Sequence, residues 1–292
     1  MTATPATIER GLTFKESSHR YKLDGQPVSG VTTIIGGGVP KPALVWWAGT
    51  VIAQWVLDPN NSTHLTGLQS GYTGEKDDPS LKFLQLLPNR ERDAAAKRGT
   101  AVHDLAEQIN LTGGADVPEN LEGYIEGYLA FLEEWQITPV LAEVIVGSRE
   151  HWYSGKVDLF AQSPLLQTAE EIAAGWVIEV DLKTSKGVYM DAALQTAAYA
   201  RAEFYMDGQI EKPIPPVSKA FVAHVTPMDR EGENNRYGDE PLGTSLYLLS
   251  DSPEKIDEHF QHFLHAKAVH EDAKVRGKIK LEPLTVPALN AA

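Results

Sequence analysis

The segment GWVIEVDLKTSKG, residues 175–187, places Glu179, Asp181 and Lys183 at alternate positions among apolar residues. Side chains of a strand alternate between the two faces of its sheet, so the pattern predicts a strand with one polar and one apolar face. The apolar face would consist of Ile178, Val180 and Leu182. An acid and a lysine two residues apart could hold a divalent cation and place an ammonium beside its bound water.

One strand cannot complete the coordination of a hard cation, since Mg²⁺ takes about six oxygen ligands. The carbonyl of Leu182, between the acid and the lysine, could supply one. The segment SGKVDLF, residues 154–160, offers a second acid, because Asp158 stands between Val157 and Leu159 where a half-buried strand favours an apolar residue. Glu143 lies between apolar positions on the preceding predicted strand and is a further candidate.

The rest of the chain alternates between helical and extended patterns. Residues 19–35 read as two strands joined at Asp24-Gly25, a strong turn dipeptide. Residues 58–89 are rich in Pro, Gly, Asn, Asp and Ser, and we expect a long irregular connection there. Further expected helices are 42–57, 89–110, 118–136, 188–206 and one that begins at Ser252-Pro253, and further strands are 139–148, 152–162, 176–184, 218–226 and 244–250. This order predicts an α/β fold with a mixed central β-sheet flanked by helices.

Four short motifs now resemble a known family. They are Gly99 to His103, Gly155 to Asp158, Asp181 to Lys183, and Gln195 to Tyr199. In this order they resemble the PD-(D/E)XK nuclease superfamily, and more narrowly its RecB-like exonuclease branch, which includes phage recombination exonucleases. The resemblance spans about residues 98–200 and implies a restriction-endonuclease-like nuclease core.

The resemblance also implies roles for individual residues. Asp158, Asp181 and the Leu182 carbonyl would bind Mg²⁺ or Mn²⁺, with His103 as a further ligand. Lys183 would orient or deprotonate the attacking water, or stabilise charge on the phosphate. Gln195 and Tyr199 share a helix face and would contact a phosphate or hold the lysine and water. Glu143 would reach a second metal or a water, although a partly exposed acid is an equally good interpretation.

The expected organisation is a single nuclease domain, residues 1–292. Its parts would be an N-terminal tail (1–14), a hairpin, helix and connection (15–89), the catalytic core (90–226), a mobile loop (227–243), a C-terminal strand and helix (244–280) and a tail (281–292).

Composition limits the partners. The formal net charge of −14 disfavours nucleic acid unless basic residues cluster locally, because phosphate binding depends on Lys and Arg. Arg98, one candidate for phosphate binding, would lie in such a lane with Arg90, Arg92, Lys97, Lys186, Lys267, Lys274, Arg276, Lys278 and Lys280. The expected partner is linear DNA, entered from an end, with a single-strand annealing protein, a helicase or a second copy of the chain as further candidates.

The chain has no cysteine, which excludes disulfides and the iron–sulfur cluster of some related nucleases. No apolar run reaches the ~20 residues that span a bilayer, and the N-terminus lacks a signal-peptide pattern. We expect no membrane association and a cytoplasmic location, in the host cell if the protein is phage-encoded.

Several alternatives stay open. His103-Asp104 is also the dipeptide of HD-type phosphohydrolases, which need a further upstream histidine and a mostly helical chain. A non-catalytic DNA-end or partner-binding module on a nuclease fold would have lost an acid or the lysine, and none is lost. Glu179, usually apolar in the family, could add a ligand or face solvent. We expect the tryptophans of residues 42–57 to be core and the C-terminal histidines (His259, His262, His265, His270) to be solvated rather than a zinc site.

Overall fold

The computed structural model describes residues 11–15, 18, 20–228 and 241–284 of the 292-residue chain. The strands are β1 Leu12–Lys15, β2 Arg20–Leu23, β3 Gln26–Gly30, β4 Thr138–Ser148, β5 Tyr153–Gln162, β6 Val177–Lys183, β7 Phe204–Asp207, β8 Ile210–Pro213, β9 Val217–Val225 and β10 Thr244–Ser250. The helices are α1 Val31–Gly38, α2 Ala43–Leu57, η2 Pro59–Asn61, α3 Ser62–Gly71, α4 Pro79–Thr112, η3 Glu119–Leu121, α5 Glu122–Glu134, α6 Ala169–Ala173, α7 Ala192–Ala200 and α8 Pro253–Arg276.

The strands form one mixed sheet, and β5 is its branch point. One edge of β5 pairs with β4, while the other edge pairs with the parallel strand β3 at its start and with the antiparallel strand β6 at its end. β6 continues into β9 as a parallel pair, and β9 pairs with β10. The residues of β5 that lie between the segments paired with β3 and with β6 have no strand partner on that edge, and Asp158 is one of them.

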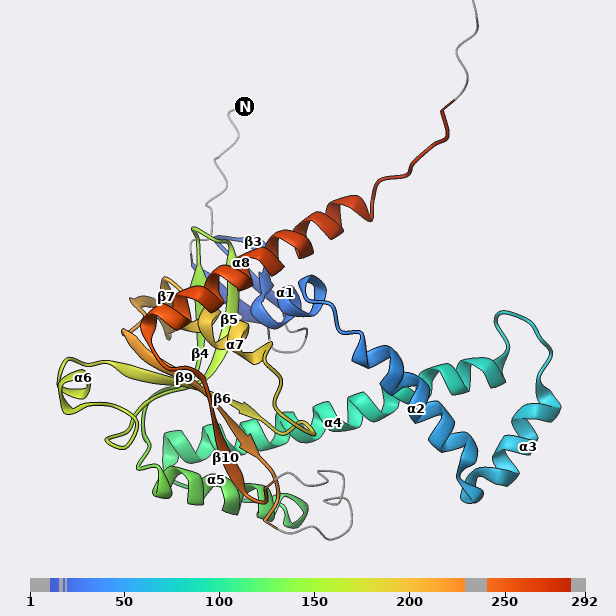
Figure 1. Cartoon of the computed structure of the whole chain (residues 1–292), viewed down its shortest axis with the longest axis horizontal. Helices are drawn as coiled ribbons and strands as arrows, with labels where there is room; N and C mark the ends of the chain where they lie inside the picture. The colour runs from blue at the N-terminus through green and yellow to red at the C-terminus, as the bar shows by residue number, and fades with distance from the viewer. Residues whose placement is uncertain (1–10, 16–17, 19, 229–240, 285–292) are drawn as a thin grey trace, which may run out of the picture.

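Helices cover both faces of the sheet (Figure 1). One core joins the sheet to α1, α7 and α8 and contains Ile34, Tyr199 and Phe263. The other joins it to α4 and α5, and α5 buries Tyr124, Ile125, Tyr128 and Phe131 at helical spacing. The expected α/β fold with a mixed central sheet flanked by helices is confirmed. The apolar face of β6 is also as predicted, since Ile178, Val180 and Leu182 all lie in the α4–α5 core.

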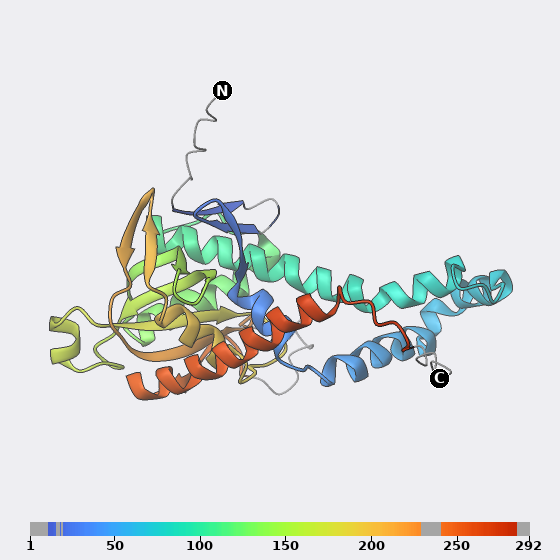
Figure 2. The ribbon, with the colours of Figure 1, turned by 90° about the horizontal axis from the view of Figure 1, so that it is seen from above.

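An arm of α2, α3 and the first half of α4 projects from this body, as Figures 1 and 2 both show. Neither α2 nor α3 buries any residue. Trp55 packs against the rings of His64 and Phe83, but the side chain of Trp46 is 81% exposed. The expectation that the tryptophans of α2 are core is therefore wrong, since Trp46 is exposed and Trp47 and Trp55 are only half-buried. An apolar helix is buried only where the fold supplies a partner.

The expected irregular connection over 58–89 is also wrong. Asp58 caps η2, α3 follows, and α4 begins at Pro79 and runs on into the expected helix 89–110. Asp78 accepts hydrogen bonds from the backbone of Ser80 and Leu81, and proline is favoured at the first helical position because it has no N–H to satisfy. These cap signals outweigh the turn-rich composition.

Two further expectations need correction. The predicted second strand of the 19–35 hairpin ends at Gly30, and the β-branched run that follows forms α1, which buries Val31, Ile34 and Ile35 at helical spacing. The helix expected over 188–206 ends at Ala200, and β7 and β8 form a hairpin whose turn contains Gly208 in the left-handed region. Tertiary packing overrides strand propensity in the first case, and in the second residues 204–207 pair with β8 across the turn at Gly208 instead of continuing the helix.

Two expected segments lie largely outside the described residues. Of the N-terminal tail, residues 1–10 are not described, whereas residues 12–15 form β1 rather than tail. Most of the predicted mobile loop, residues 229–240, and the end of the C-terminal tail, residues 285–292, are not described either. Within the described part of the chain, no helix combines the length and hydropathy required to cross a membrane.

Candidate active site

Asp158 occupies the point where β6 diverges from β5. One of its carboxylate oxygens accepts a hydrogen bond of 2.7 Å from the backbone N–H of Leu182, which lies beyond the last paired residue of β6 on that edge. The Asp158 carboxylate therefore takes the place of the β5 carbonyl that would otherwise accept from the Leu182 N–H. In an extended strand the N–H and C=O of one residue point to the same edge. The Leu182 carbonyl is thus directed toward the edge that carries Asp158, the position that the sequence assigns to it.

The helix α4 brings His103 to this edge. Its Nδ1 lies 3.3 Å from Oδ1 of Asp158 and 4.0 Å from Oε1 of Glu143. One turn earlier α4 passes close to the segment after β6, since a Cβ on Gly99 would lie 3.1 Å from Oγ1 of Thr184. Gly99 thus lets α4 pass close to the segment after β6, and His103, four residues later, lies on the same helix face.

Glu143 reaches the site from β4 through an unusual backbone conformation. The register of β4 and β5 places it opposite Asp158, and its φ of 53° lies in the left-handed region, which is costly for a residue with a side chain. Its other carboxylate oxygen, Oε2, contacts Nζ of Lys156 at 2.6 Å. A strained acid at this position points to a functional constraint rather than to packing alone.

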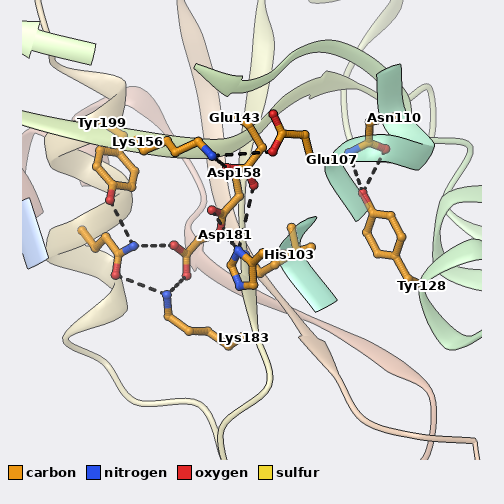
Figure 3. A network of polar contacts seen from close by, with 12 residues as sticks. His103, Glu107, Asn110, Tyr128, Glu143, Lys156, Asp158, Asp181, Lys183 and Tyr199 are labelled. Carbon is orange, nitrogen blue, oxygen red and sulfur yellow. Dashed lines mark hydrogen bonds and ion pairs between the residues drawn. The ribbon is translucent and has the colours of Figure 1, made fainter. Parts of the chain in front are cut away.

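Together these side chains form a group able to hold a metal ion. His103, Glu143 and Asp158 each offer one ligand atom, and the three atoms lie within 4.8 Å of one another. Two carboxylate oxygens and one imidazole nitrogen suit a divalent cation such as Mn²⁺, and the remaining positions suit water. We call His103, Glu143, Asp158 and Lys156 the metal half of the site (Figure 3).

Asp181, Lys183, Gln195 and Tyr199 form the lysine half beside it. Nζ of Lys183 lies 2.5 Å from Oδ2 of Asp181 and 3.3 Å from Oε1 of Gln195. The amide of Gln195 donates to Oδ1 of Asp181 at 2.6 Å and contacts the Tyr199 hydroxyl at 3.3 Å. Asp181 is thus directed at Lys183 and Gln195 and is not a member of the three-residue metal group, although the sequence predicts it as a ligand.

Gly155 explains why the Gly-x-x-Asp and Gln-x-x-x-Tyr motifs occur together. A Cβ at this position would collide with the ring of Tyr199, so only glycine lets α7 seat that ring against β5. Tyr199 is buried, and its hydroxyl steadies Gln195. Gln195 therefore contacts Lys183, Asp181 and Tyr199, whereas the expected contact with a phosphate or with the attacking water stays a prediction.

In the metal half, burial and neighbouring charges shift the pKa values of His103 and Asp158 in opposite directions. Burial alone would lower the pKa of His103, but the carboxylate of Asp158 outweighs it and the pKa rises to about 9. Burial would raise the pKa of Asp158, but His103 and Lys183 hold it below its usual value. Burial and the charge of Asp158 raise the pKa of Glu143 to about 7, despite the opposing effect of Lys156. Such perturbed groups are typical of functional sites.

The acid of the lysine half, Asp181, has a raised pKa, as Glu143 has and Asp158 has not. Burial is the main reason that the pKa of Asp181 rises to about 6, while Lys183 acts against it. Burial would lower the pKa of Lys183, but Asp181 and Asp158 outweigh it and the pKa is raised. Lys183 therefore carries its charge at neutral pH and is poorly suited to accept a proton.

Glu179 does not face solvent, which corrects one of the two alternatives for it. Its side chain is fully buried, and neither carboxylate oxygen finds a hydrogen-bond partner among the described residues. Burial, followed by the charge of Asp181, raises the pKa of Glu179 well above the usual value and so favours its protonated form. It also lies outside the metal group.

A cavity of about 250 Å³ adjoins the lysine half. It is lined on one side by Lys183 and Gln195 and on the other by Thr32 and Lys41. Lys41 forms an ion pair of 2.7 Å with Asp191, which also lines the cavity. No local sequence pattern indicates Lys41 or Asp191, because their contact depends on tertiary structure. Lys156 was missed as well, although its position two residues before Asp158 places both on one face of β5.

The predicted basic lane is only partly supported. Arg98 is half-buried on α4 beside Gly99, near the site. Lys186 lies 3.9 Å from Glu91 of α4, which brings the segment after β6 alongside that helix. On α8, however, Lys267 pairs with Glu271 and Arg276 pairs with Asp272, so their charges are offset.

Two alternatives lose support. Asp104 is exposed, His103 pairs with Asp158 instead, and His64 lies on α3 in the arm, so the HD-type site does not form among these residues. The C-terminal histidines are not members of the metal group found in the described residues. They are not all solvated, since His259 and His270 are buried and the former contacts the hydroxyl of Ser250.

Comparison with protein-family models gives no match, and comparison with curated proteins gives none at a significant level. Function must therefore be inferred from the geometry of the site and from the resemblance of its motifs.

Proposed function

We propose that this chain is an Mg²⁺- or Mn²⁺-dependent deoxyribonuclease of the PD-(D/E)XK type, without an iron–sulfur cluster, that hydrolyses phosphodiester bonds from DNA ends. The observation that carries the proposal is the convergence of His103, Glu143 and Asp158, from three separate elements, beside a half-buried lysine at the end of the next strand. All four motifs on which the resemblance rests contribute residues to this one site.

The chemistry divides between the two halves of the site. When bound by His103, Glu143 and Asp158, the divalent cation would lower the pKa of a water molecule and polarise a phosphoryl oxygen. Lys183, held by Asp181 and Gln195, places a fixed positive charge where negative charge develops on the phosphate. Because its pKa is raised, electrostatic stabilisation fits Lys183 better than the general-base role. Water attack on phosphorus and departure of one ester oxygen leave a terminal phosphate and a hydroxyl.

Entry from a DNA end fits the charge distribution. The chain has 40 acidic and 26 basic residues, so most of its surface repels a duplex. Productive contact would then be confined to the neighbourhood of Arg98, Lys183 and Lys41, which lie on or beside the site. We propose linear DNA as the substrate, in recombination, replication or repair, with an annealing protein, a helicase or a second copy as candidate partners.

The test compares covalently closed circular DNA with the same DNA linearised, at low salt with Mg²⁺ or Mn²⁺. We expect progressive loss of the linear form alone, and no loss when the metal is chelated. A parallel preparation of Asp158→Asn controls for contaminating nucleases. Discrete fragments from the closed circle would replace the proposal with an endonuclease, and absence of any metal-dependent cleavage would favour a non-catalytic DNA-binding module.

A further inference from the structure

Lys156 occupies a distinctive position in the metal half. It stands two residues before Asp158 on β5, and its Nζ lies 2.6 Å from Oε2 of Glu143 and 3.6 Å from Oε2 of Glu107. Glu107 lies one turn after His103 on α4, so both side chains face β5. Figure 3 shows the ammonium of Lys156 between the two glutamates.

The two oxygens of Glu143 face different cations. Oε1 lies 4.0 Å from Nδ1 of His103, on the side of the metal group, whereas Oε2 contacts Nζ of Lys156 at 2.6 Å. Glu143 is only 7% exposed, and its backbone is fixed in the left-handed region opposite Asp158. It therefore has little freedom to present both oxygens to metal ions while Lys156 remains in place.

The formal charges balance with a single divalent ion. Glu107, Glu143 and Asp158 carry three negative charges when ionised, and one divalent cation together with Lys156 carries three positive charges. In two-metal sites the ions lie roughly 3.5–4 Å apart and share carboxylates. A second ion that shared Glu143 would have to bind its Oε2, but the ammonium of Lys156 already contacts that oxygen.

We propose that Lys156 stands in for a second divalent cation, so that the site binds one metal ion per chain, between His103, Glu143 and Asp158. This inference rests on the proposed metal site but not on DNA cleavage. It assigns Lys156 as a positioning residue, which neutralises Glu107 and holds the carboxylate of Glu143 with Oε1 toward His103.

The test counts Mn²⁺ ions per chain by isothermal titration calorimetry and by electron paramagnetic resonance of free Mn²⁺. We expect one ion for the wild-type chain, two for Lys156→Gln, and one for Lys156→Arg, which keeps the cation. Lys212→Gln is the matched control, because it also frees a carboxylate, Asp207, from an ion pair of 2.5 Å, but on the β7–β8 hairpin. This control should bind one ion.

Each outcome has a distinct meaning. Two ions on the wild-type chain would overturn the inference and leave the proposed metal site standing, and this result needs no variant to fold. One ion on a folded Lys156→Gln would reduce Lys156 to an ordinary ion pair and also overturn it. Absence of Mn²⁺ binding by the wild-type chain would instead contradict the metal site itself, and with it the proposed function.

Discussion

The two halves of the site differ in how they are assembled. The metal half joins β4 and β5 to His103 of the distant helix α4, and its acids contact His103 and Lys156. The lysine half comes from β6 and α7 alone, within residues 181–199, and is closed by hydrogen bonds of Gln195. Ion binding therefore depends on the packing of α4 against β4 and β5, whereas β6 and α7 alone orient the lysine.

If this division is right, Asp158→Asn should have the largest effect, because Asp158 connects His103 to Leu182 and belongs to the metal group. We expect cleavage to fall by roughly 10³-fold or more, since a bound metal contributes several kcal/mol to such reactions. Mn²⁺ binding should be lost with it. Asparagine retains an acceptor for the Leu182 N–H, so circular dichroism should remain unchanged.

The matched control is Asp257→Asn, which removes the charge of an exposed acid on α8 that pairs with Arg201, the residue after α7. It should cleave as the wild type does. Near-normal Mg²⁺-dependent cleavage by Asp158→Asn would remove the metal half from the mechanism.

Asp181→Asn tests where the boundary between the halves lies. The sequence predicts Asp181 as a ligand, but its oxygens contact Lys183 and Gln195. We expect cleavage to fall by roughly 10²-fold or more, because the lysine loses the partner that orients it. Mn²⁺ affinity, measured by calorimetry, should fall less than in Asp158→Asn. An equal fall in affinity would place Asp181 in the metal half.

His103→Ala should have the smallest effect of these substitutions, since two carboxylates remain. Imidazole suits Mn²⁺ better than Mg²⁺, so the ratio of cleavage rates with the two ions should change. We expect the ratio of the Mg²⁺ rate to the Mn²⁺ rate to rise by about tenfold, which is the order by which metal affinity falls when a ligand loses its supporting contacts. His265→Ala on the exposed face of α8 is the control. Full activity with an unchanged ratio would exclude His103 as a ligand.

Much of the site could be predicted from the sequence because it follows from alternation and short spacing. The strand β6 separates its apolar and charged residues by the period of two, and Gln195 and Tyr199 share a helix face by the period of four. The same local patterns predicted the sheet, α5 and the cap of α8. The α/β class followed from the order of these elements.

What the sequence could not predict depends on contacts between distant segments. The ion pair of Lys41 with Asp191 and the left-handed conformation of Glu143 have no local signature. The exposure of Trp46 is of the same kind, because apolar spacing shows that a face is hydrophobic but not whether the fold covers it. The Asp78-Pro79 helix start, in contrast, was a local signal that composition obscured.

The most direct test of the central claim is Lys183→Ala, measured for Mn²⁺ binding and for cleavage of linear DNA in the same preparation. Lys183 contacts Asp181 and Gln195 but none of the three metal-group side chains by hydrogen bond or ion pair in the described residues. The account predicts that Mn²⁺ binds at least as tightly as to the wild type, because a positive charge is removed nearby. Cleavage should fall by roughly 10²- to 10⁴-fold. Cleavage near the wild-type rate, or loss of Mn²⁺ binding from a folded variant, would contradict it.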